Sequence, residues 1–304
     1  MKQTKPIISA CIISYNQQDY IAAAIEGALS QELIVPYEIV ISDDYSTDNT
    51  PQIIAEFAKK DPRIRVLKHA KNVGMLRNWL QSINACKGSY VALCEGDDFW
   101  TDNQKLAKQL AVLQNNPSFS SCFTDASLNA EKTVHLRFNS YLLENDVDLD
   151  QSQFSLTDLS KGNFIPTCTI MFRKEGDLNL PKEYFSSPYA DWFVHIYNAL
   201  AGDFVLIPEQ TASYRLQNAG VFGQIPQLER DRYKLKCLAL LYQGYSYNQS
   251  AQKLLKKSTQ YAIELRATNF RGAGNIRKFL LLKIISKLYH LTGFATFARQ
   301  AARV

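Results

Sequence analysis

The sequence predicts an α/β protein built on a doubly wound, mainly parallel sheet. Short apolar runs, many of them β-branched, alternate with amphipathic segments over the first 124 residues, as successive strand–helix units do. Polar and acidic clusters directly follow three of the predicted strands. In such sheets ligands bind beyond the carboxyl ends of the strands, so we expect the three clusters to share one edge.

The predicted strands are short runs of buried character, and they cover 7–14, 37–42, 63–68, 90–94, 119–124, 167–172 and 204–207. The predicted helices repeat apolar residues at spacings of three and four, and they cover 21–29, 50–57, 76–88, 103–114 and 191–201. Thr50 followed by Pro51 is typical of an N-cap with proline at the first helical position. We expect residues 126–160 to be irregular and the chain from about residue 227 to be helical.

Composition excludes several classes of protein. A chain of 304 residues that is 46% hydrophobic can bury a substantial core. Its six cysteines form no C-x-x-C pair and mostly lie in apolar runs, which indicates buried thiols in a reducing compartment. Residues 1–6 are polar, so we expect no signal peptide, and no apolar run approaches the ~20 residues of a spanning helix. We therefore expect a cytosolic protein, or one attached to a membrane only from the cytosolic side.

The net charge of +5 is unevenly distributed. Residues 253–304 contain eleven Lys and Arg and one acidic residue, which gives them +10 against −5 for the rest. A basic tail indicates an anionic partner surface, and because no known nucleic-acid motif accompanies it, we expect lipid head groups rather than DNA or RNA. Ile276, Leu280 and Ile284 recur at helical spacing, which predicts a helix in the membrane interface. The alternative is a helix packed on the rest of the protein with a solvated basic face.

The acidic string Glu95-Gly96-Asp97-Asp98 directly follows the strand at 90–94. Adjacent carboxylates repel one another, and a divalent cation offsets their charge. Mg²⁺ and Mn²⁺ prefer oxygen ligands and can also hold substrate phosphates. The alternative is a solvated acidic turn, or an aspartate that caps the next helix.

A second pair, Asp43-Asp44, ends the strand at 37–42. One of these carboxylates could accept hydrogen bonds from a nucleobase or a ribose. Tyr15 follows the first strand and could offer its ring to a base, although a partly buried loop aromatic is the simpler interpretation.

Four motifs in this order resemble the inverting family 2 glycosyltransferases. They are IISYN at 12–16, EIVISDDYSTDNT at 38–50, NVG at 72–74 with RN at 77–78, and EGDDFW at 95–100. The resemblance covers roughly residues 6–223, and EGDDFW followed by QKL at 104–106 is similar to bacterial enzymes that build surface polysaccharides. It implies a GT-A fold, a nucleoside-diphosphate sugar donor, a catalytic domain at 1–225 and a helical, basic region at 226–304.

The resemblance also implies a role for each matched residue at the nucleotide. Tyr15 would pack against the base, Asp44 would contact it, and Asp43 would lie beside Asp44. Arg77 would lie near the base or the diphosphate.

The acidic string receives the remaining donor roles from the same resemblance. Asp97 would reach the ribose or the metal, and Asp98 would coordinate the metal, Mn²⁺ or Mg²⁺. Glu95 stands where an aspartate is often found, and its longer side chain would reach the metal through water or not at all.

The later part of the family pattern matches more loosely. The segment YADWF at 189–193 resembles the one that holds the catalytic base, so Asp191 becomes the base candidate, with a helix N-cap as the alternative. The segment YRLQ at 214–217 resembles Tyr-Arg-x-His, and Gln217 stands where a histidine is common. Any contribution of that histidine to metal or diphosphate binding is therefore weakened or replaced. Residues 218–223 would form a mobile loop that closes on the donor.

Together with these features, the resemblance implies a metal-dependent glycosyltransferase, and the resemblance alone implies that it is inverting. It would move a sugar from a nucleoside-diphosphate sugar, with UDP weakly favoured, to a hydroxyl of a glycan or lipid-linked acceptor in surface polysaccharide biosynthesis, such as capsule or O-antigen. A nucleotidyltransferase acting on sugar phosphates is one alternative, but residues 15–20 lack the glycine and basic residue its triphosphate loop needs. A non-catalytic nucleotide-sugar-binding protein is the other, and it would not need Asp191. No G-x-G-x-x-G follows a strand, which argues against a dehydrogenase.

Overall fold

The computed structural model describes residues 5–129, 151–215, 227–272 and 274–288, and contacts divide the chain into two compact units. The first unit comprises Met1–Ser155, Phe164–Asn179 and Ala201–Leu216, and the second comprises Leu156–Asn163, Leu180–Leu200 and Gln217–Val304. The segment that holds Asp191 thus groups with the C-terminal helices. The predicted domain boundary at residue 225 separates regions that would fold independently. The division into compact units does not test it, so it stays a prediction.

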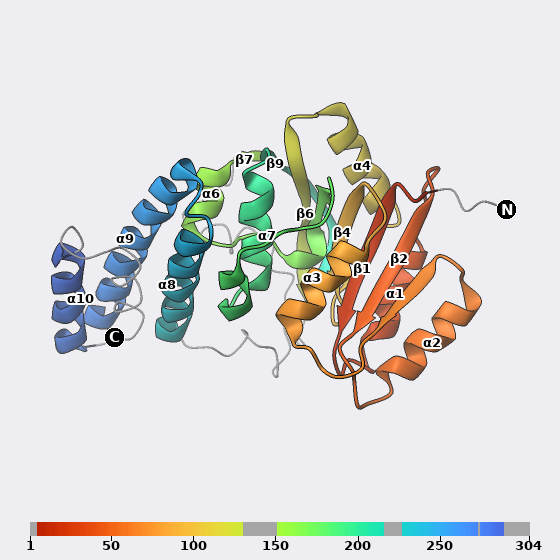
Figure 1. Ribbon diagram of the computed structural model, residues 1–304, viewed down its shortest axis with the longest axis horizontal. Helices are drawn as coiled ribbons and strands as arrows, with labels where there is room; N and C mark the ends of the chain where they lie inside the picture. Colours follow the sequence, from red (N-terminus) through yellow and green to blue (C-terminus); the bar gives the residue numbers. More distant parts are fainter. Residues whose placement is uncertain (1–4, 130–150, 216–226, 273, 289–304) are drawn as a thin grey trace. The chain divides into compact units, whose positions relative to one another are not determined.

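The first unit is built on a nine-stranded sheet with the order β3-β2-β1-β4-β8-β6-β9-β5, and β7 pairs with β9 (Figure 1). Its strands are β1 (Ile8–Ser14), β2 (Tyr37–Asp43), β3 (Ile64–Lys68), β4 (Tyr90–Glu95), β5 (Phe99–Trp100), β6 (Phe119–Asn129), β7 (Gln153–Phe154), β8 (Ile170–Arg173) and β9 (Asp203–Arg215). The pairs β3–β2, β2–β1, β1–β4 and β6–β9 are parallel, while β8 runs antiparallel to both β4 and β6. The sheet is therefore mixed but mostly parallel, as the sequence predicts.

Helices cover both faces of the parallel half of this sheet. They are α1 (Ile21–Leu29), α2 (Thr50–Lys60), α3 (Met75–Ala85) and α4 (Lys105–Asn115). Alternate residues of β1, β2 and β4 join α1, α2 and α4 in one hydrophobic cluster, and α3 packs on the other face, where Asn78 Nδ2 donates to the Ser42 carbonyl at 3.1 Å. Because both faces are covered, β1, β2 and β4 are buried along almost their whole length and are mainly apolar.

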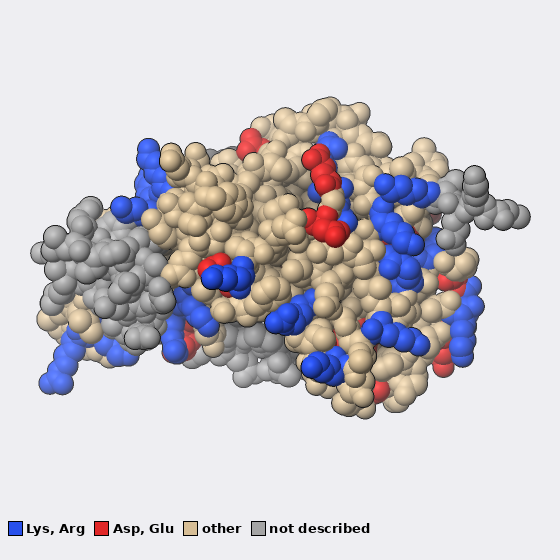
Figure 2. Space-filling view, viewed as in Figure 1, with Lys and Arg blue, Asp and Glu red and all other residues tan. Residues whose placement is uncertain are grey.

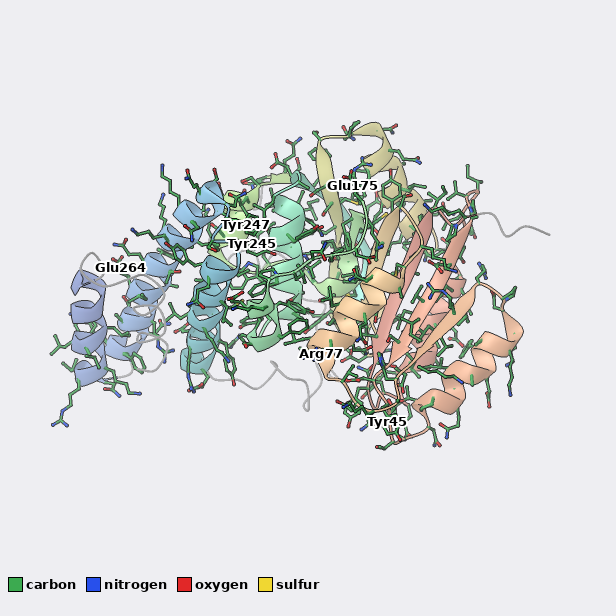
Figure 3. The ribbon with its side chains drawn as sticks, viewed as in Figure 1. Tyr45, Arg77, Glu175, Tyr245, Tyr247 and Glu264 are labelled. Atoms are coloured by element: carbon green, nitrogen blue, oxygen red, sulfur yellow. The ribbon has the colours of Figure 1, made fainter. Side chains whose placement is uncertain are left out.

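The second unit is helical in its described part. It contains α6 (Leu156–Lys161), a 3₁₀ turn at Lys182–Ser186, α7 (Ala190–Ala199), α8 (Gln227–Gly244), α9 (Gln249–Gly272) and α10 (Ile276–Leu288). The polar atoms of its buried aromatic side chains form hydrogen bonds. Trp192 Nε1 donates to the Leu159 carbonyl at 2.8 Å, and the hydroxyl of Tyr245, which Figure 3 labels, donates to the Phe193 carbonyl at 2.9 Å. Within the described residues, we find no helix with the length and apolar character needed to cross a bilayer.

Several local expectations need correction. Asn49, not Thr50, is the N-cap of α2; the Thr50 hydroxyl instead accepts the Gln17 N–H at 2.8 Å and joins the loop after β1 to this helix. Residues 167–169 form a 3₁₀ turn, and strand β8 begins only at residue 170. Within the stretch expected to be irregular, β6 continues to residue 129 because it pairs with β9, and β7 and α6 follow further on. All six cysteines are buried and unpaired, as predicted.

Candidate active site

The loops after β1 and β2 form one hydrogen-bonded structure organised by Asp43. Its Oδ1 accepts the hydroxyls of Ser14 (3.0 Å) and Ser46 (2.5 Å), and its Oδ2 accepts the Ser46 N–H at 2.9 Å. Asn16, with φ of 51°, donates its N–H to the Ser46 hydroxyl at 2.8 Å. The buried Asp43 carboxylate is thus occupied by its own loops.

Asp44 links the NVG motif at residues 72–74 to the end of β2 by hydrogen bonds. Its Oδ1 accepts the Val73 N–H at 2.7 Å, its Oδ2 accepts the Gly74 N–H at 2.9 Å, and its carbonyl accepts Asn72 Nδ2 at 3.0 Å. Gly74 has φ of 86°, which favours glycine at the start of α3. Each carboxylate oxygen of the buried Asp44 keeps a second lone pair with which to accept a hydrogen bond from a base.

The exposed predicted residues gather near this structure. Tyr15 follows β1 and its side chain is 48% exposed, and Arg77 is exposed in the first turn of α3. Figure 3 places Arg77 and Tyr45 at the same end of the first unit, where β1 and β2 end. A cavity of about 580 Å³ opens beside Tyr45, and it is lined by Asp43, Tyr45 and residues of α2 and β3. The structure therefore brings Tyr15, Asp43, Asp44 and Arg77 to one edge of the sheet.

The acidic loop, defined here as residues 95–98, lies tightly against the end of β1. The Gly96 N–H donates to the Ile13 carbonyl at 2.8 Å. A Cβ added at Gly96 would lie 3.0 Å from that carbonyl and 2.4 Å from Gln17 Oε1. Any side chain at this position would therefore force the Gln17 side chain and the Ile13 carbonyl to move.

Asp98 is the most buried carboxylate of this loop, with 1% of its surface exposed. Its Oδ1 accepts the Arg215 N–H at 2.8 Å, whereas Oδ2 is buried and accepts no hydrogen bond of normal geometry from the described residues. Burial and the neighbouring charge of Asp97 raise the pKa of Asp98 to about 8, while Arg215 and the Cys168 thiol act in the opposite direction. Burial also raises the pKa of Asp97.

These carboxylates fit a divalent cation. An unfilled, buried carboxylate oxygen beside a second acid is an environment that positive charge relieves. In the described part of the chain, no three His, Cys, Asp or Glu side chains are grouped to hold an ion, so the half-buried Glu95 as a third ligand stays a prediction. Mg²⁺ commonly takes only one or two carboxylates and completes its shell with substrate phosphates and water.

Three further residues lie around the acidic loop, and the sequence interpretation assigned no role there to Arg215 or Lys105. Arg215 reaches the loop from β9, and Trp100 Nε1 donates to the Cys168 carbonyl at 2.9 Å. Lys105 is fully buried, and its Nζ donates to Gln109 Oε1 at 2.7 Å and to the Thr169 carbonyl at 3.0 Å. Burial lowers the pKa of Lys105 to about 8.

A signal for Lys105 was present in the sequence. Lys105 and Gln109 lie four residues apart on the apolar stripe of α4, among buried leucines at 106, 110 and 113. Two polar residues at i and i+4 on a buried face indicate a polar contact inside the core.

Asp191 lies in the first turn of α7, in the second unit. The cap residue of this helix is Tyr189, so the N-cap alternative does not describe Asp191. Its half-buried carboxylate accepts Asn163 Nδ2 at 2.5 Å through Oδ2 and the Trp192 N–H at 2.9 Å through Oδ1. Gln217 and the loop at 218–223 lie outside the described residues.

Comparison with known proteins identifies close relatives by sequence. An uncharacterized protein of Mycobacterium tuberculosis is 34% identical over 218 residues, which is 71% of this chain and 60% of that protein. This chain thus spans about 60% of the length of the first curated relatives it matches. The putative teichuronic acid biosynthesis glycosyltransferase TuaG of Bacillus subtilis is 30% identical over 226 residues, covering 73% of this chain and 83% of TuaG.

Solved structures share the fold. The mannosyltransferase PcManGT of Pyrobaculum calidifontis, in complex with GDP-Man and Mn²⁺, aligns with a TM-score of 0.59 at 14% identity over 99% of this chain and 87% of its own. TarS of S. aureus, in complex with UDP-GlcNAc, aligns with a TM-score of 0.57 at 15% identity over 93% and 91%. The model of the family described as glycosyl transferase family 2 matches residues 9–175, more than half of the chain. The chain therefore belongs to glycosyl transferase family 2, and its fold is the GT-A type that its motifs led us to expect.

Proposed function

We propose that this protein transfers a sugar, with inversion, from a nucleoside-diphosphate sugar to a hydroxyl of a glycan or lipid-linked acceptor in bacterial surface polysaccharide biosynthesis. The observation that carries the proposal is Asp98, whose buried Oδ2 accepts no hydrogen bond of normal geometry from the described residues although a second acid adjoins it. That arrangement suits an enzyme whose leaving group is a metal-bound diphosphate.

The donor in this proposal is a UDP-sugar. TarS was solved with UDP-GlcNAc and TuaG is assigned to teichuronic acid biosynthesis, which supports a nucleotide sugar and a polysaccharide product. Tyr15 and Arg77 are exposed at the edge where Asp44 retains free lone pairs, so these three residues would hold the base and the diphosphate. Asp43 would act through the loop that it organises, and Asp97 would reach the ribose or the metal.

Asp98, with Asp97 and more distantly Glu95, would hold Mn²⁺ or Mg²⁺, and PcManGT was solved with Mn²⁺. Such an ion, when bound, neutralises the charge that develops on a departing diphosphate. Asp191 would take the proton from the acceptor hydroxyl as that oxygen attacks the anomeric carbon. The UDP leaves from the opposite face, so the configuration inverts.

The base assignment is tested by Asp191→Asn. Asn has the same size, and its carbonyl oxygen can still accept the Trp192 N–H, while its amide nitrogen can pair with a flipped Asn163 side chain; it cannot take a proton. General base catalysis is typically a factor of roughly 10² to 10⁴, so we expect turnover to fall at least about a hundredfold while donor affinity and melting temperature stay near wild type. Asp158→Asn, in the first turn of α6 in the same unit, is the matched control and should turn over normally. Normal turnover of Asp191→Asn would remove Asp191 as the base.

Donor hydrolysis separates this function from its alternatives. Without acceptor, a glycosyltransferase slowly releases UDP from its correct sugar nucleotide. A nucleotidyltransferase would instead require added pyrophosphate and convert the nucleotide sugar to a nucleoside triphosphate and a sugar 1-phosphate. A binding protein would melt at a higher temperature with the ligand but release nothing. A panel of sugar nucleotides with and without Mn²⁺ therefore identifies both the class and the donor.

We also propose that the basic C-terminal region contacts an anionic membrane surface on the cytosolic side. On α10, Ile276 and Leu280 are each 52% exposed and Leu281 is 45% exposed, with Arg277 and Lys278 between them. Figure 2 shows a few Lys and Arg side chains at the lower edge of the region where α10 lies. Apolar side chains beside basic ones suit an interfacial helix, to which each basic residue adds about 1 kcal/mol.

Flotation with vesicles rich in phosphatidylserine tests this surface. Changing Arg277 and Lys278 to Glu should release the protein from the vesicles. The same change at Lys59 and Lys60, an exposed basic pair at the end of α2, is the control and should leave flotation unchanged. Equal flotation of both variants would refute membrane contact through α10.

A further inference from the structure

Arg215, the last residue of β9, reaches both aspartates of the acidic loop. Its backbone N–H donates to Asp98 Oδ1 at 2.8 Å, and its Nη1 donates to the Asp97 carbonyl at 2.7 Å. These residues are more than a hundred positions apart in the sequence. The half-buried Arg215 therefore fixes the loop from a strand outside the parallel half of the sheet.

Two aromatic rings hold the guanidinium in place. Its carbon lies 4.3 Å from the ring centroid of Phe99 and 5.2 Å from that of Tyr20, within the range of cation–π contact. Among the described residues, Arg215 forms no salt bridge with a carboxylate. Its side-chain contact with the Asp97 carbonyl thus depends on a planar, forked side chain that stacks and donates at once, which lysine cannot reproduce, whereas the backbone contact with Asp98 does not.

We propose that Arg215 is a positioning residue for the cation that the acidic loop would hold. Its Nη1 fixes the Asp97 carbonyl, and its backbone N–H fixes Asp98 Oδ1. This leaves the buried Oδ2 of Asp98 as the oxygen presented to the ion. The inference rests on the metal-dependent function proposed above. Partners that orient a metal ligand typically contribute a factor of about 10–100 to metal affinity or activity.

The test compares Arg215→Lys with a matched variant, Arg173→Lys. Arg173 also stands on a strand, donates to a carbonyl (Phe119, 2.9 Å) and lies over an aromatic ring (Tyr90, 5.4 Å), but it pairs with the first residue of β4, at the other end of that strand from the acidic loop. Mn²⁺ is titrated calorimetrically into metal-free protein saturated with UDP. We expect Arg215→Lys to bind Mn²⁺ at least about tenfold more weakly than wild type and Arg173→Lys to bind it normally.

Steady-state kinetics give a readout that simple destabilisation would not produce. Because Asp98 itself is intact in Arg215→Lys, we expect a raised KM for Mn²⁺ with turnover at saturating Mn²⁺ restored to within about twofold. Loss of folded protein would instead lower turnover at every Mn²⁺ concentration. If Arg215→Lys does not fold, Tyr20→Leu removes one ring under the guanidinium and should raise the KM for Mn²⁺ in the same direction, by a smaller factor.

Two results would overturn the assignment. Wild-type Mn²⁺ affinity in Arg215→Lys would show that the loop does not need the guanidinium. Weaker UDP binding in the absence of Mn²⁺, with unchanged Mn²⁺ affinity, would show that Arg215 contacts the diphosphate directly. If wild-type protein with UDP binds no Mn²⁺ at all, this result refutes the proposed metal-dependent function, and with it the role of Arg215.

Discussion

Asp43-Asp44 at the end of β2 and Asp97-Asp98 beyond the end of β4 are the same sequence feature in different surroundings. The first pair accepts five hydrogen bonds from hydroxyls and backbone N–H groups: two serine hydroxyls and three amides. In the second pair, Asp97 interacts with the Gln17 side chain. Asp98 accepts one hydrogen bond, from the Arg215 N–H, and in the described residues its Oδ2 accepts none of normal geometry.

The comparison shows how the donors around a carboxylate decide what it does. A buried carboxylate whose oxygens are filled by fixed N–H groups stabilises the fold and orients a loop. A buried carboxylate with an unfilled oxygen carries an electrostatic cost that only a proton or a cation removes. The β2 pair therefore builds the site, and only the remaining lone pairs of Asp44 are open to a base, whereas the β4 pair is suited to hold a cation.

Asp98→Asn is the most direct test of the proposed difference between the two aspartate pairs. The substitution keeps the size of the side chain and removes its charge, so we expect the fold to persist and metal-dependent turnover to fall by about a thousandfold or more, since a catalytic cation contributes several kcal/mol. Turnover is measured with saturating donor across a Mn²⁺ titration. Turnover that still responds to Mn²⁺ as wild type does would exclude Asp98 as a ligand.

Asp44→Asn tests the opposite role. The amide nitrogen of Asn would face the N–H of either residue 73 or residue 74, which leaves one buried donor without an acceptor. We expect a loss of about 1–3 kcal/mol in the free energy of unfolding, measured by urea denaturation. Full stability in Asp44→Asn would mean that the loop after β3 does not depend on this carboxylate.

The pH dependence of stability sharpens the comparison further. Because burial raises the pKa of Asp98 to about 8 in the folded state, the folded protein holds this proton more tightly than the unfolded chain does. In metal-free protein the stabilising effect is complete below about pH 4 and is lost as the pH rises through 8.

At pH 8 we therefore expect metal-free Asp98→Asn to melt higher than wild type, by roughly 2–4 °C if the difference is about 1 kcal/mol. The two proteins should converge toward pH 4, and thermal unfolding at several pH values in EDTA measures the difference. A gap that widens toward low pH would have the wrong sign for a raised pKa.

The sequence was a sufficient guide to the features that depend on local pattern. Mainly apolar runs predicted the bounds of β1, β2 and β4 to within a residue or two. Strands covered on both faces lack the alternation of polar and apolar residues, so they are recognised as short apolar runs. The clustering of Tyr15, Asp44 and Arg77 also followed, since parallel strands end at one edge. The match of the family model over residues 9–175 rests on the same motifs.

Features that depend on distant pairing could not be read in this way. The extension of β6 and β9 reflects their mutual hydrogen bonds, which are made across more than 80 residues of sequence. The contact of Arg215 with Asp98 uses a backbone N–H, which every residue type except proline supplies. The identity of residue 215 therefore does not predict this contact. For the same reason the backbone N–H groups that fill Asp44 were invisible in the sequence.

The six buried thiols also decide how this protein can be labelled. Burial raises the pKa of Cys94, Cys122, Cys168 and Cys237, so very little thiolate forms at neutral pH, and maleimides react with thiolate. A cysteine introduced at an exposed position, such as Tyr45→Cys at the edge where β2 ends, would then be modified selectively with all native cysteines left in place. A fluorophore attached there gives an optical reporter of nucleotide arrival in an otherwise unaltered chain.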